Sequence, residues 1–185
     1  KVMPFPTETE GADVEILQRV AEETGYNFDD LWKIYGYESS HGTHPDMNDP
    51  RSSYQGPFQF DKRLADSLGI DRYDLYESAK AFVGHLDYRK DRLQKNIKNT
   101  IGSSDFLDSL DPALLDYLLH QQGGKGVARL GIAHSGDRRT YNKIRSTLLQ
   151  NLTSEQQEHF INKTKSPEEA IEYWVKSQEE NLKRR

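Results

Sequence analysis

The sequence predicts a mainly α-helical, single-domain protein with at most a small β element near residues 41–60. Apolar residues recur at spacings of three and four through most of the chain, which is the period of an amphipathic helix. Capping residues, glycines and prolines separate these periodic runs. The segment 54–60 is the only plausible extended piece. At 185 residues, the length favours one domain over 1–185.

The first part of the chain is expected to hold two helices and a long loop. After an irregular lead-in over 1–12, a helix is predicted from about 13 to 24, and Gly25 stops it. Asn27 is a good N-cap for the second helix, because its side-chain oxygen can accept from a free backbone N–H. Residues 41–55 are rich in Gly, Pro, Asp, Asn and Ser, so they form a loop in this interpretation.

A short helix and a long helix are expected after the loop. The short one covers about 62–68 and ends at Gly69. The long one covers about 74–97, where Asp74 and Glu77 have the spacing of a capping box.

Five helices are predicted from residue 111 onward. Asp111-Pro112 is a cap followed by proline at the first helical position, and Gly123-Gly124 breaks the helix that it opens. The last helix begins at Ser166-Pro167. Between these two, helices are expected at 125–133, 138–150 and 154–163.

Composition excludes several classes of function. The chain has 25 Lys and Arg against 30 Asp and Glu, a net charge of −5, whereas a general nucleic-acid binder needs a basic surplus to neutralise phosphates. Without cysteine it has no disulfide, no thiolate metal site and no cysteine nucleophile. No stretch approaches the ~20 apolar residues of a membrane span. We therefore expect neither nucleic acid nor membrane insertion.

Glu38 is the candidate for a catalytic acid. It follows Ile34 by four residues and Leu31 by seven, so the three side chains share one helix face. On a buried face at the C-terminal end of a helix, desolvation and the helix dipole both raise the pKa of a carboxyl and favour its protonated form. Such a carboxyl can act as a general acid. The alternative is a glutamate at the rim of the helix, paired with Lys or Arg.

Four short motifs follow in order. The first is Glu38-Ser39-Ser40 at a helix end, and after a polar loop comes Gly56-Pro57-Phe58-Gln59. The third is Leu119-His120-Gln121-Gln122-Gly123, and the fourth is Glu169-Ala170-Ile171-Glu172-Tyr173-Trp174. The set resembles the soluble lytic transglycosylases (SLT domains) of the lysozyme-like superfamily, glycoside hydrolase family 23. The His-Gln-Gln-Gly form is similar to that of phage virion-associated members.

The resemblance implies a lysozyme-like fold with Glu38 as the catalytic acid. It also implies a set of substrate-binding residues: Ser39, Gln59, Tyr54, Phe58, His120, Gln121 and Tyr173. Ser39 would hydrogen-bond sugar or orient the acid. Gln59 would hold the N-acetyl group and Tyr173 would hydrogen-bond Glu38, while Tyr54, Phe58 and Tyr117 would stack on sugar rings. The alternatives are a helix-capping Ser39, an ordinary loop Gln59 and core aromatics. Two departures stand out: Pro57-Phe58 replaces Leu-Met, and His120-Gln121 replaces Tyr-Asn.

The implied reaction cleaves peptidoglycan between N-acetylmuramic acid and N-acetylglucosamine and closes a 1,6-anhydro ring, using one carboxyl. Most glycosidases use two, and Asp46 and Asp49 are the nearby candidates for a second. A hydrolytic lysozyme (muramidase) therefore stays open. So do a chitin-directed glycosidase and a non-catalytic glycan-binding or virion structural module.

No cofactor and no metal are expected. His41 and His44 have a ligand-like spacing but lie in a loop without a third ligand in sequence. The expected partner is the peptidoglycan glycan strand, with the chain as part of a larger virion or secretion assembly. Because it begins with Lys and carries no signal peptide, we expect a virion-associated location or delivery to the periplasm and cell wall.

Overall fold

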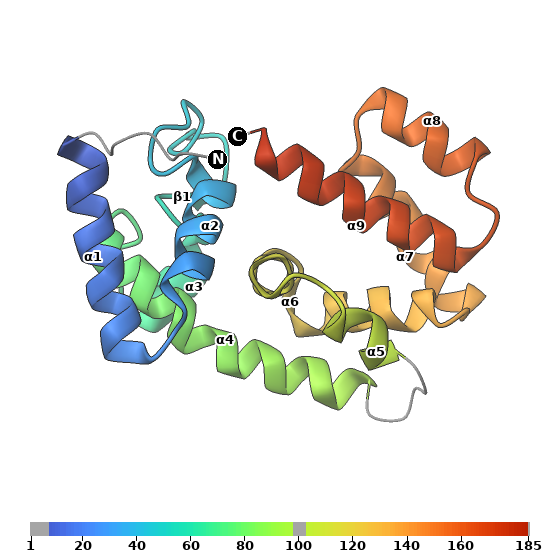
Figure 1. The fold of residues 1–185 in the computed structure, drawn as a ribbon, viewed down its shortest axis with the longest axis horizontal. Helices are drawn as coiled ribbons and strands as arrows, with labels where there is room; N and C mark the ends of the chain where they lie inside the picture. Colours follow the sequence, from blue (N-terminus) through green and yellow to red (C-terminus); the bar gives the residue numbers. More distant parts are fainter. Residues whose placement is uncertain (1–7, 98–102, 185) are drawn as a thin grey trace. The chain divides into compact units, whose positions relative to one another are not determined.

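The computed structural model describes residues 8–97 and 103–184, and this part is mainly helical (Figure 1). It contains nine α-helices and one two-stranded sheet, which confirms the predicted mainly-α fold with a small β element. The chain divides into two compact units, 1–85 and 86–184, and the division falls within α4 (Leu75–Ile97). Each unit is described by itself. A single domain over 1–185 stays a prediction.

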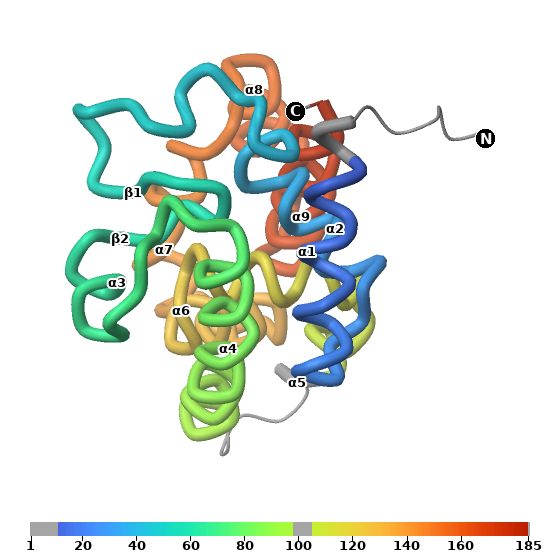
Figure 2. Tube along the Cα trace, turned by 90° about the vertical axis from the view of Figure 1, so that its left-hand side faces the viewer, coloured from blue at the N-terminus to red at the C-terminus, as the bar shows by residue number. Residues whose placement is uncertain are grey.

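Two helices that lie side by side form one wall of the first unit, α1 (Glu8–Thr24) and α2 (Phe28–Ser39) (Figures 1 and 2). α1 begins within the predicted lead-in, so the expectation of an irregular 1–12 is wrong from Glu8 onward, and residues 1–7 lie outside the described part. No proline follows Pro6 there, and acidic residues favour a helix N-terminus. The Asn27 cap is confirmed, because its side chain accepts from Asp30 N at 3.0 Å.

A small hairpin and a short helix follow the loop. β1 (Tyr54–Gln55) and β2 (Phe60–Asp61) are antiparallel, with Tyr54 opposite Asp61. Asp61 caps α3 (Lys62–Leu68) by accepting from Arg63 N at 2.8 Å, and the helix ends at Gly69, as predicted. The core of this unit is apolar and comes from α1, α2, the hairpin and α4: Leu17, Val20, Leu31, Ile34, Phe58, Phe60 and Phe82.

The second unit is helical throughout its described residues. After the second part of α4 it contains α5 (Ser103–Asp108), α6 (Pro112–His134), α7 (Arg138–Gln150), α8 (Ser154–Asn162) and α9 (Pro167–Lys183). The predicted caps are confirmed, since Asp111 accepts from Leu114 N and Ser166 from Glu169 N. Only α5 was not predicted. α6 packs against α5, α7 and α9, and Trp174 of α9 is fully buried.

α6 bends at the predicted break. Gly123 has φ 75° and ψ 167°, so two helical pieces meet there. The bend removes helical partners from the carbonyls before it, and Arg89 Nη1 donates to one of them, Leu119 O, at 2.6 Å. Gly124 lies against the backbone of α4, where a Cβ would be 2.4 Å from Arg89 O. Glycine is therefore needed for this close approach.

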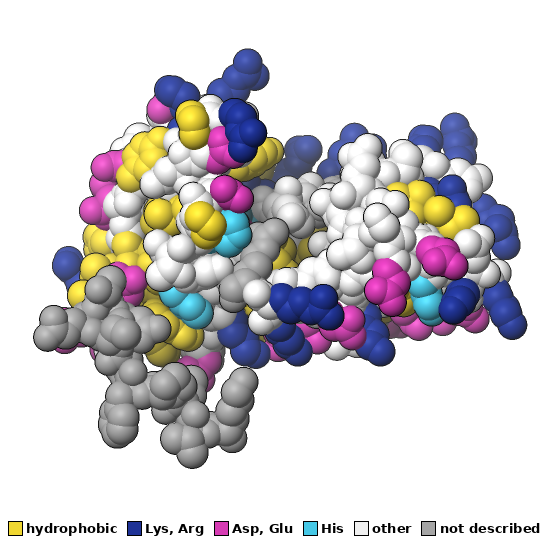
Figure 3. Space-filling view, turned by 90° about the horizontal axis from the view of Figure 1, so that it is seen from above, with side chains coloured by type: hydrophobic (Ala, Val, Ile, Leu, Met, Phe, Trp, Pro, Cys, Tyr) yellow, Lys and Arg dark blue, Asp and Glu magenta, His cyan; other side chains and the backbone are white. Residues whose placement is uncertain are grey.

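The distribution of charged side chains and the hydropathy of the helices agree with the composition. On the face drawn in Figure 3, Lys and Arg side chains lie among Asp and Glu side chains. No helix among residues 8–97 and 103–184 is long and apolar enough to cross a membrane.

Candidate functional site

Glu38 lies next to the last residue of α2, in the first unit. Leu31, Ile34 and Tyr35 on the same helix face are buried, while Glu38 is half-buried. Its side chain thus lies between the two positions that the sequence left open, the buried face and the exposed rim. Partial burial lowers the solvation of a carboxylate without removing access to solvent.

A left-handed turn begins at Ser40, two residues after Glu38. Ser40, His41 and Gly42 have φ values of 51°, 54° and 76°, three successive residues in the left-handed region. A side chain in this region costs of order 1–2 kcal/mol, so neighbouring contacts must hold it. Ser40 N donates to Gly36 O at 2.9 Å, which ends the helix and begins the turn.

His41 binds the turn back onto α2. Its ring stacks on Trp32 with centroids 4.2 Å apart and meets Tyr35 edge-on at 5.4 Å. Its Nε2 lies 3.1 Å from Trp32 O and donates to it in the Nε2–H tautomer. The ring fits because residue 36 is glycine, where a Cβ would be 2.8 Å from His41 Cε1. This role explains the histidine without a metal.

Ser39 is fully buried and serves the helix end. Its hydroxyl donates to Tyr35 O at 3.3 Å and accepts from Gly42 N at 3.0 Å. A residue with no exposed surface does not touch a sugar, so the expected substrate contact of Ser39 is corrected. The alternative, a helix-terminating serine, describes its position.

Tyr35 of α2 packs against the same turn at Gly42. Its hydroxyl donates to Asp13 Oδ2 at 2.7 Å, and burial, followed by the hydrogen bond to Asp13, raises its pKa. The hydroxyl therefore stays a donor at every physiological pH. A Cβ on Gly42 would lie 2.6 Å from the Tyr35 hydroxyl oxygen, so both the space and the positive φ require glycine at this position.

Gln59 joins the second motif to the loop. Its Nε2 donates to Met47 O at 2.7 Å and to Gly56 O at 2.8 Å, and its backbone has φ 50°. Gly56 N in turn donates to Asn48 Oδ1 at 3.1 Å. The amide nitrogen of Gln59 is thus used within the loop.

Arg72 fixes the hairpin from the side. Its Nη1 donates to Ser53 O at 2.7 Å and Phe60 O at 3.1 Å, and its Nη2 donates to Gln55 Oε1 at 3.3 Å. The Tyr73 hydroxyl also donates to Gln55 Oε1. Sequence analysis missed these residues because the contacts join positions up to 19 apart without a local pattern.

Asp49 is held by its neighbour Arg51. Arg51 Nε donates to Oδ1 at 3.1 Å and Nη2 to Oδ2 at 2.9 Å, and these hydrogen bonds hold the pKa of Asp49 below its usual value. Asp49 is therefore an ionised structural carboxylate of the loop. Asp46, the other candidate for a second carboxylate, is exposed.

The three candidate sugar-stacking aromatics differ in exposure. Tyr54 has 53% of its surface exposed. Phe58 is fully buried, with its ring stacked on Tyr35 at 5.7 Å and against Phe82 at 5.5 Å, and Tyr117 is also buried. The expectation that Phe58 and Tyr117 stack on sugar is therefore wrong, because both rings belong to cores.

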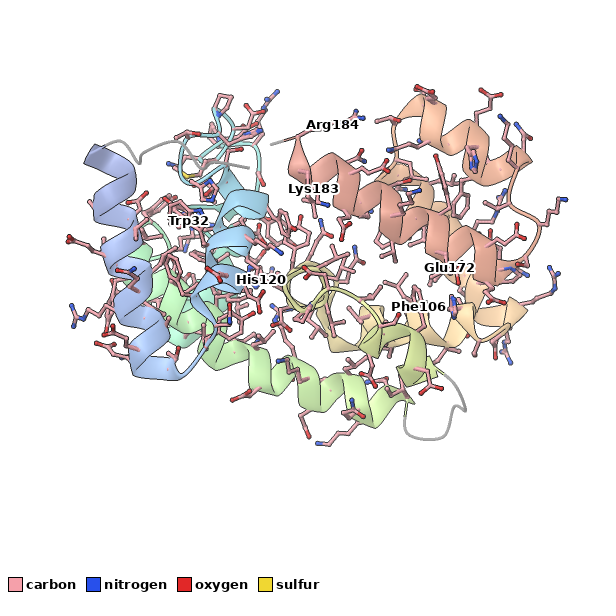
Figure 4. The ribbon with its side chains drawn as sticks, in the orientation of Figure 1. Trp32, Phe106, His120, Glu172, Lys183 and Arg184 are labelled. Atoms are coloured by element: carbon pink, nitrogen blue, oxygen red, sulfur yellow. The ribbon has the colours of Figure 1, made fainter. Side chains whose placement is uncertain are left out.

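The third and fourth motifs lie in the second unit. Gln121 is exposed and donates from Nε2 to the Tyr117 hydroxyl at 3.3 Å, and His120 beside it is half-buried (Figure 4). Tyr173 stacks on His159 of α8 with centroids 4.0 Å apart, beside a polar cavity of about 330 Å³. Its hydroxyl has no hydrogen-bond partner among the residues that the structure describes.

Comparison of the chain with protein-family models, curated proteins and solved structures found no significant match. The chemical argument therefore depends on the residues described above.

Proposed function

We propose that this chain is a lytic transglycosylase of peptidoglycan, with Glu38 as its general acid and base. The observation that carries the proposal is a half-buried glutamate at a helix end, with a fixed left-handed turn that begins two residues later at Ser40. A general acid must be held in one position relative to the bond that it protonates.

The surroundings of Glu38 supply this fixed position. Three left-handed residues in a row are maintained by the His41 stack, the buried Ser39 hydroxyl and the Tyr35–Asp13 hydrogen bond. Backbone strain that is supported from several sides is common at active sites. The loop after the turn is held in the same way by Gln59 and Arg72.

In the proposed reaction Glu38 acts twice. Its carboxyl gives a proton to the glycosidic oxygen as the bond from C1 of N-acetylmuramic acid to this oxygen breaks, which releases the 4-hydroxyl of N-acetylglucosamine. The carboxylate then takes the proton of the 6-hydroxyl while that oxygen bonds to C1. The product is a 1,6-anhydro sugar, Glu38 regains its proton, and no water is consumed. Gln59 Oε1 is the proposed acceptor for the N-acetyl N–H.

A hydrolytic muramidase is the second candidate. It requires another carboxylate to activate water or to attack C1. The binding of both Asp49 oxygens by Arg51 disfavours this residue in that role, which leaves the exposed Asp46 as the remaining candidate of the two. A non-catalytic glycan-binding or virion structural module is the third.

Partners and location are proposed from the motifs alone. The glycan strand of peptidoglycan is the proposed substrate, and His120, Gln121 and Tyr173 of the second unit are proposed substrate contacts. The His-Gln-Gln-Gly motif favours a phage virion-associated enzyme, or one delivered to the periplasm by a secretion assembly.

Digestion of purified peptidoglycan in oxygen-18 water, followed by mass spectrometry, tests the proposal. A transglycosylase releases anhydro-muropeptides, one water lighter than the reducing form and without label. A muramidase releases reducing muropeptides that carry the label. Unchanged peptidoglycan, with binding in a pull-down on insoluble walls, would instead support a binding module.

A further inference from the structure

We propose that His134, Glu168 and Glu172 bind a divalent transition-metal ion in the second unit. One ligand atom from each of the three side chains lies within 4.8 Å of the other two. They are the only group of three or more potential metal ligands among residues 8–97 and 103–184. The proposal does not rest on the proposed glycosidic chemistry, although Glu172 belongs to the fourth motif and directly precedes Tyr173.

The backbone brings the three ligands together from two helices. His134 is the last residue of α6, and Glu168 and Glu172 lie four positions apart in the first two turns of α9, so they share one face. Ligand atoms at ~2.0–2.2 Å from a tetrahedral ion lie about 3.4 Å from one another. The two glutamates are exposed, so rotation of their side chains closes the remaining gap.

His134 is already oriented toward the carboxylates. Its ring stacks on Phe106 of α5 with centroids 3.8 Å apart and planes 8° apart, and only 15% of its side chain is exposed. Its Nε2 lies 2.9 Å from Glu172 Oε1, the distance of a hydrogen bond. A metal ion would replace the proton between Nε2 and Oε1. Because the ring is already held in place, less conformational entropy is lost when the ion binds.

The charges of the cluster also favour a cation. Like charges four residues apart on a helix repel each other. Across the described ranges, the Glu168 carboxylate has no ion pair and no side-chain hydrogen bond, and Glu172 has only the neutral or singly charged His134 as its ion-pair partner. A dication would compensate both carboxylates. The positive N-terminus of α9 opposes it, whereas the negative C-terminus of α6 favours it, so the helix dipoles offset each other.

Of the three ligands, Glu172 borders a cavity. It has a volume of about 250 Å³, and its walls include Phe106 and Glu172, both labelled in Figure 4, together with Leu114, Val175 and Lys176. Three protein ligands leave at least one coordination position for water or for a small anion.

The ligand set selects the class of metal. One imidazole nitrogen with two carboxylates suits Zn²⁺, Co²⁺ or Ni²⁺, whereas Ca²⁺ takes six to eight oxygen ligands and Mg²⁺ keeps most of its water. Sequence analysis did not find the site because His134 lies 34 residues before Glu168, a spacing without a metal motif.

Isothermal titration of the chelator-treated chain with ZnCl₂ or CoCl₂ tests the proposal. We expect one site per chain, with binding weakened ~10-fold or more in His134→Gln and in Glu172→Gln. Glu168→Gln removes an exposed ligand without a structural partner, so it tests the site in a variant that keeps its fold. Matched controls are His159→Gln and Glu180→Gln, which should leave binding unchanged.

A second readout is thermal stability. Zn²⁺ should raise the unfolding temperature of the wild type, EDTA should reverse the rise, and Glu168→Gln should show less of it. The proposal fails if Zn²⁺ binds all three ligand variants as tightly as the wild type, since the chain has six histidines that could bind it elsewhere. It also fails if no Zn²⁺ binds, or if Ca²⁺ binds equally well. None of these results depends on peptidoglycan cleavage.

Discussion

The imidazole of His41 lies on the indole of Trp32, with ring planes 24° apart, although His41 already belongs to the turn after α2. The chain between the two residues contains Glu38, the proposed catalytic acid. The stack therefore fixes the end of the helix that carries this carboxyl. It also supports a left-handed residue that would otherwise be unfavourable.

We expect His41→Ala to destabilise the protein by about 1–2 kcal/mol, because it removes an aromatic stack and a hydrogen bond while the strained backbone remains. Peptidoglycan cleavage should fall further than stability does, since Glu38 loses its support. Urea unfolding and clearing of purified cell walls measure the two effects. His44→Ala is the control, because its Nδ1 accepts a local hydrogen bond from Asp46 N, two residues along the chain. Equal effects of the two variants would show that the stack does not position the site.

Glu38→Gln should abolish cell-wall cleavage and leave the fold intact. The amide is nearly isosteric with the carboxyl but cannot give or take the proton that the reaction needs. Wall clearing measures the activity, and the unfolding midpoint measures the fold. Glu15→Gln, an exposed residue of α1, should keep full activity. Clearing by Glu38→Gln above a few per cent of the wild-type rate would refute the assignment.

Gly124→Ala should destabilise the chain by about 2–3 kcal/mol, because the new Cβ would lie 2.4 Å from Arg89 O and 2.7 Å from Leu93 N. Both are backbone atoms of α4, so neither can rotate away. Gly84→Ala is the matched control. A Cβ at Gly84 would have no neighbouring atom within 4 Å apart from the backbone of its own helix. It should stabilise α4 by about 0.5–1 kcal/mol, because alanine loses less backbone entropy in a helix. Equal unfolding midpoints for the two variants would contradict this account.

Acid should weaken the first unit in part through Glu23. Hydrogen bonds from Tyr76 and then Arg19 lower its pKa from 4.5 to about 2. Because the pKa is lower in the folded state, the stabilisation is complete above pH 4.5 and is lost as the pH falls toward 2. Over this window, the stability of Glu23→Gln should fall less steeply than that of the wild type. Urea unfolding at several pH values checks this, and Glu22→Gln should follow the wild type.

Tyr173→Phe tests the fourth motif. If the unpartnered hydroxyl contacts substrate, turnover should fall by ~10- to 1000-fold, while stability changes by no more than about 1 kcal/mol because the ring keeps its stack on His159. Steady-state cleavage of defined muropeptides measures the turnover. Tyr141→Phe is the control, since this ring packs on Phe160 of α8. Equal turnover of both variants and the wild type would remove Tyr173 from the site.

The sequence by itself determined where most helices begin and end. Asn27 and Asp111 cap the helices that they were predicted to cap, and Gly69 and Gly123 end or bend theirs. These features are readable because a cap, a positive φ or a missing N–H acts within about four residues along the chain. The placement of Glu38 near a helix end follows from the same local rules.

Only the tertiary structure decided what the loop and motif side chains touch. Ser39 and Phe58 looked like substrate contacts and are buried, whereas Arg72 gave no signal and holds the hairpin. The His134–Glu172 pair joins helix ends 38 residues apart. In a loop no periodicity tells which way a side chain faces, and contacts between distant residues depend on how whole helices pack. That packing brought the proposed metal ligands together and buried three of the expected sugar contacts, Ser39, Phe58 and Tyr117.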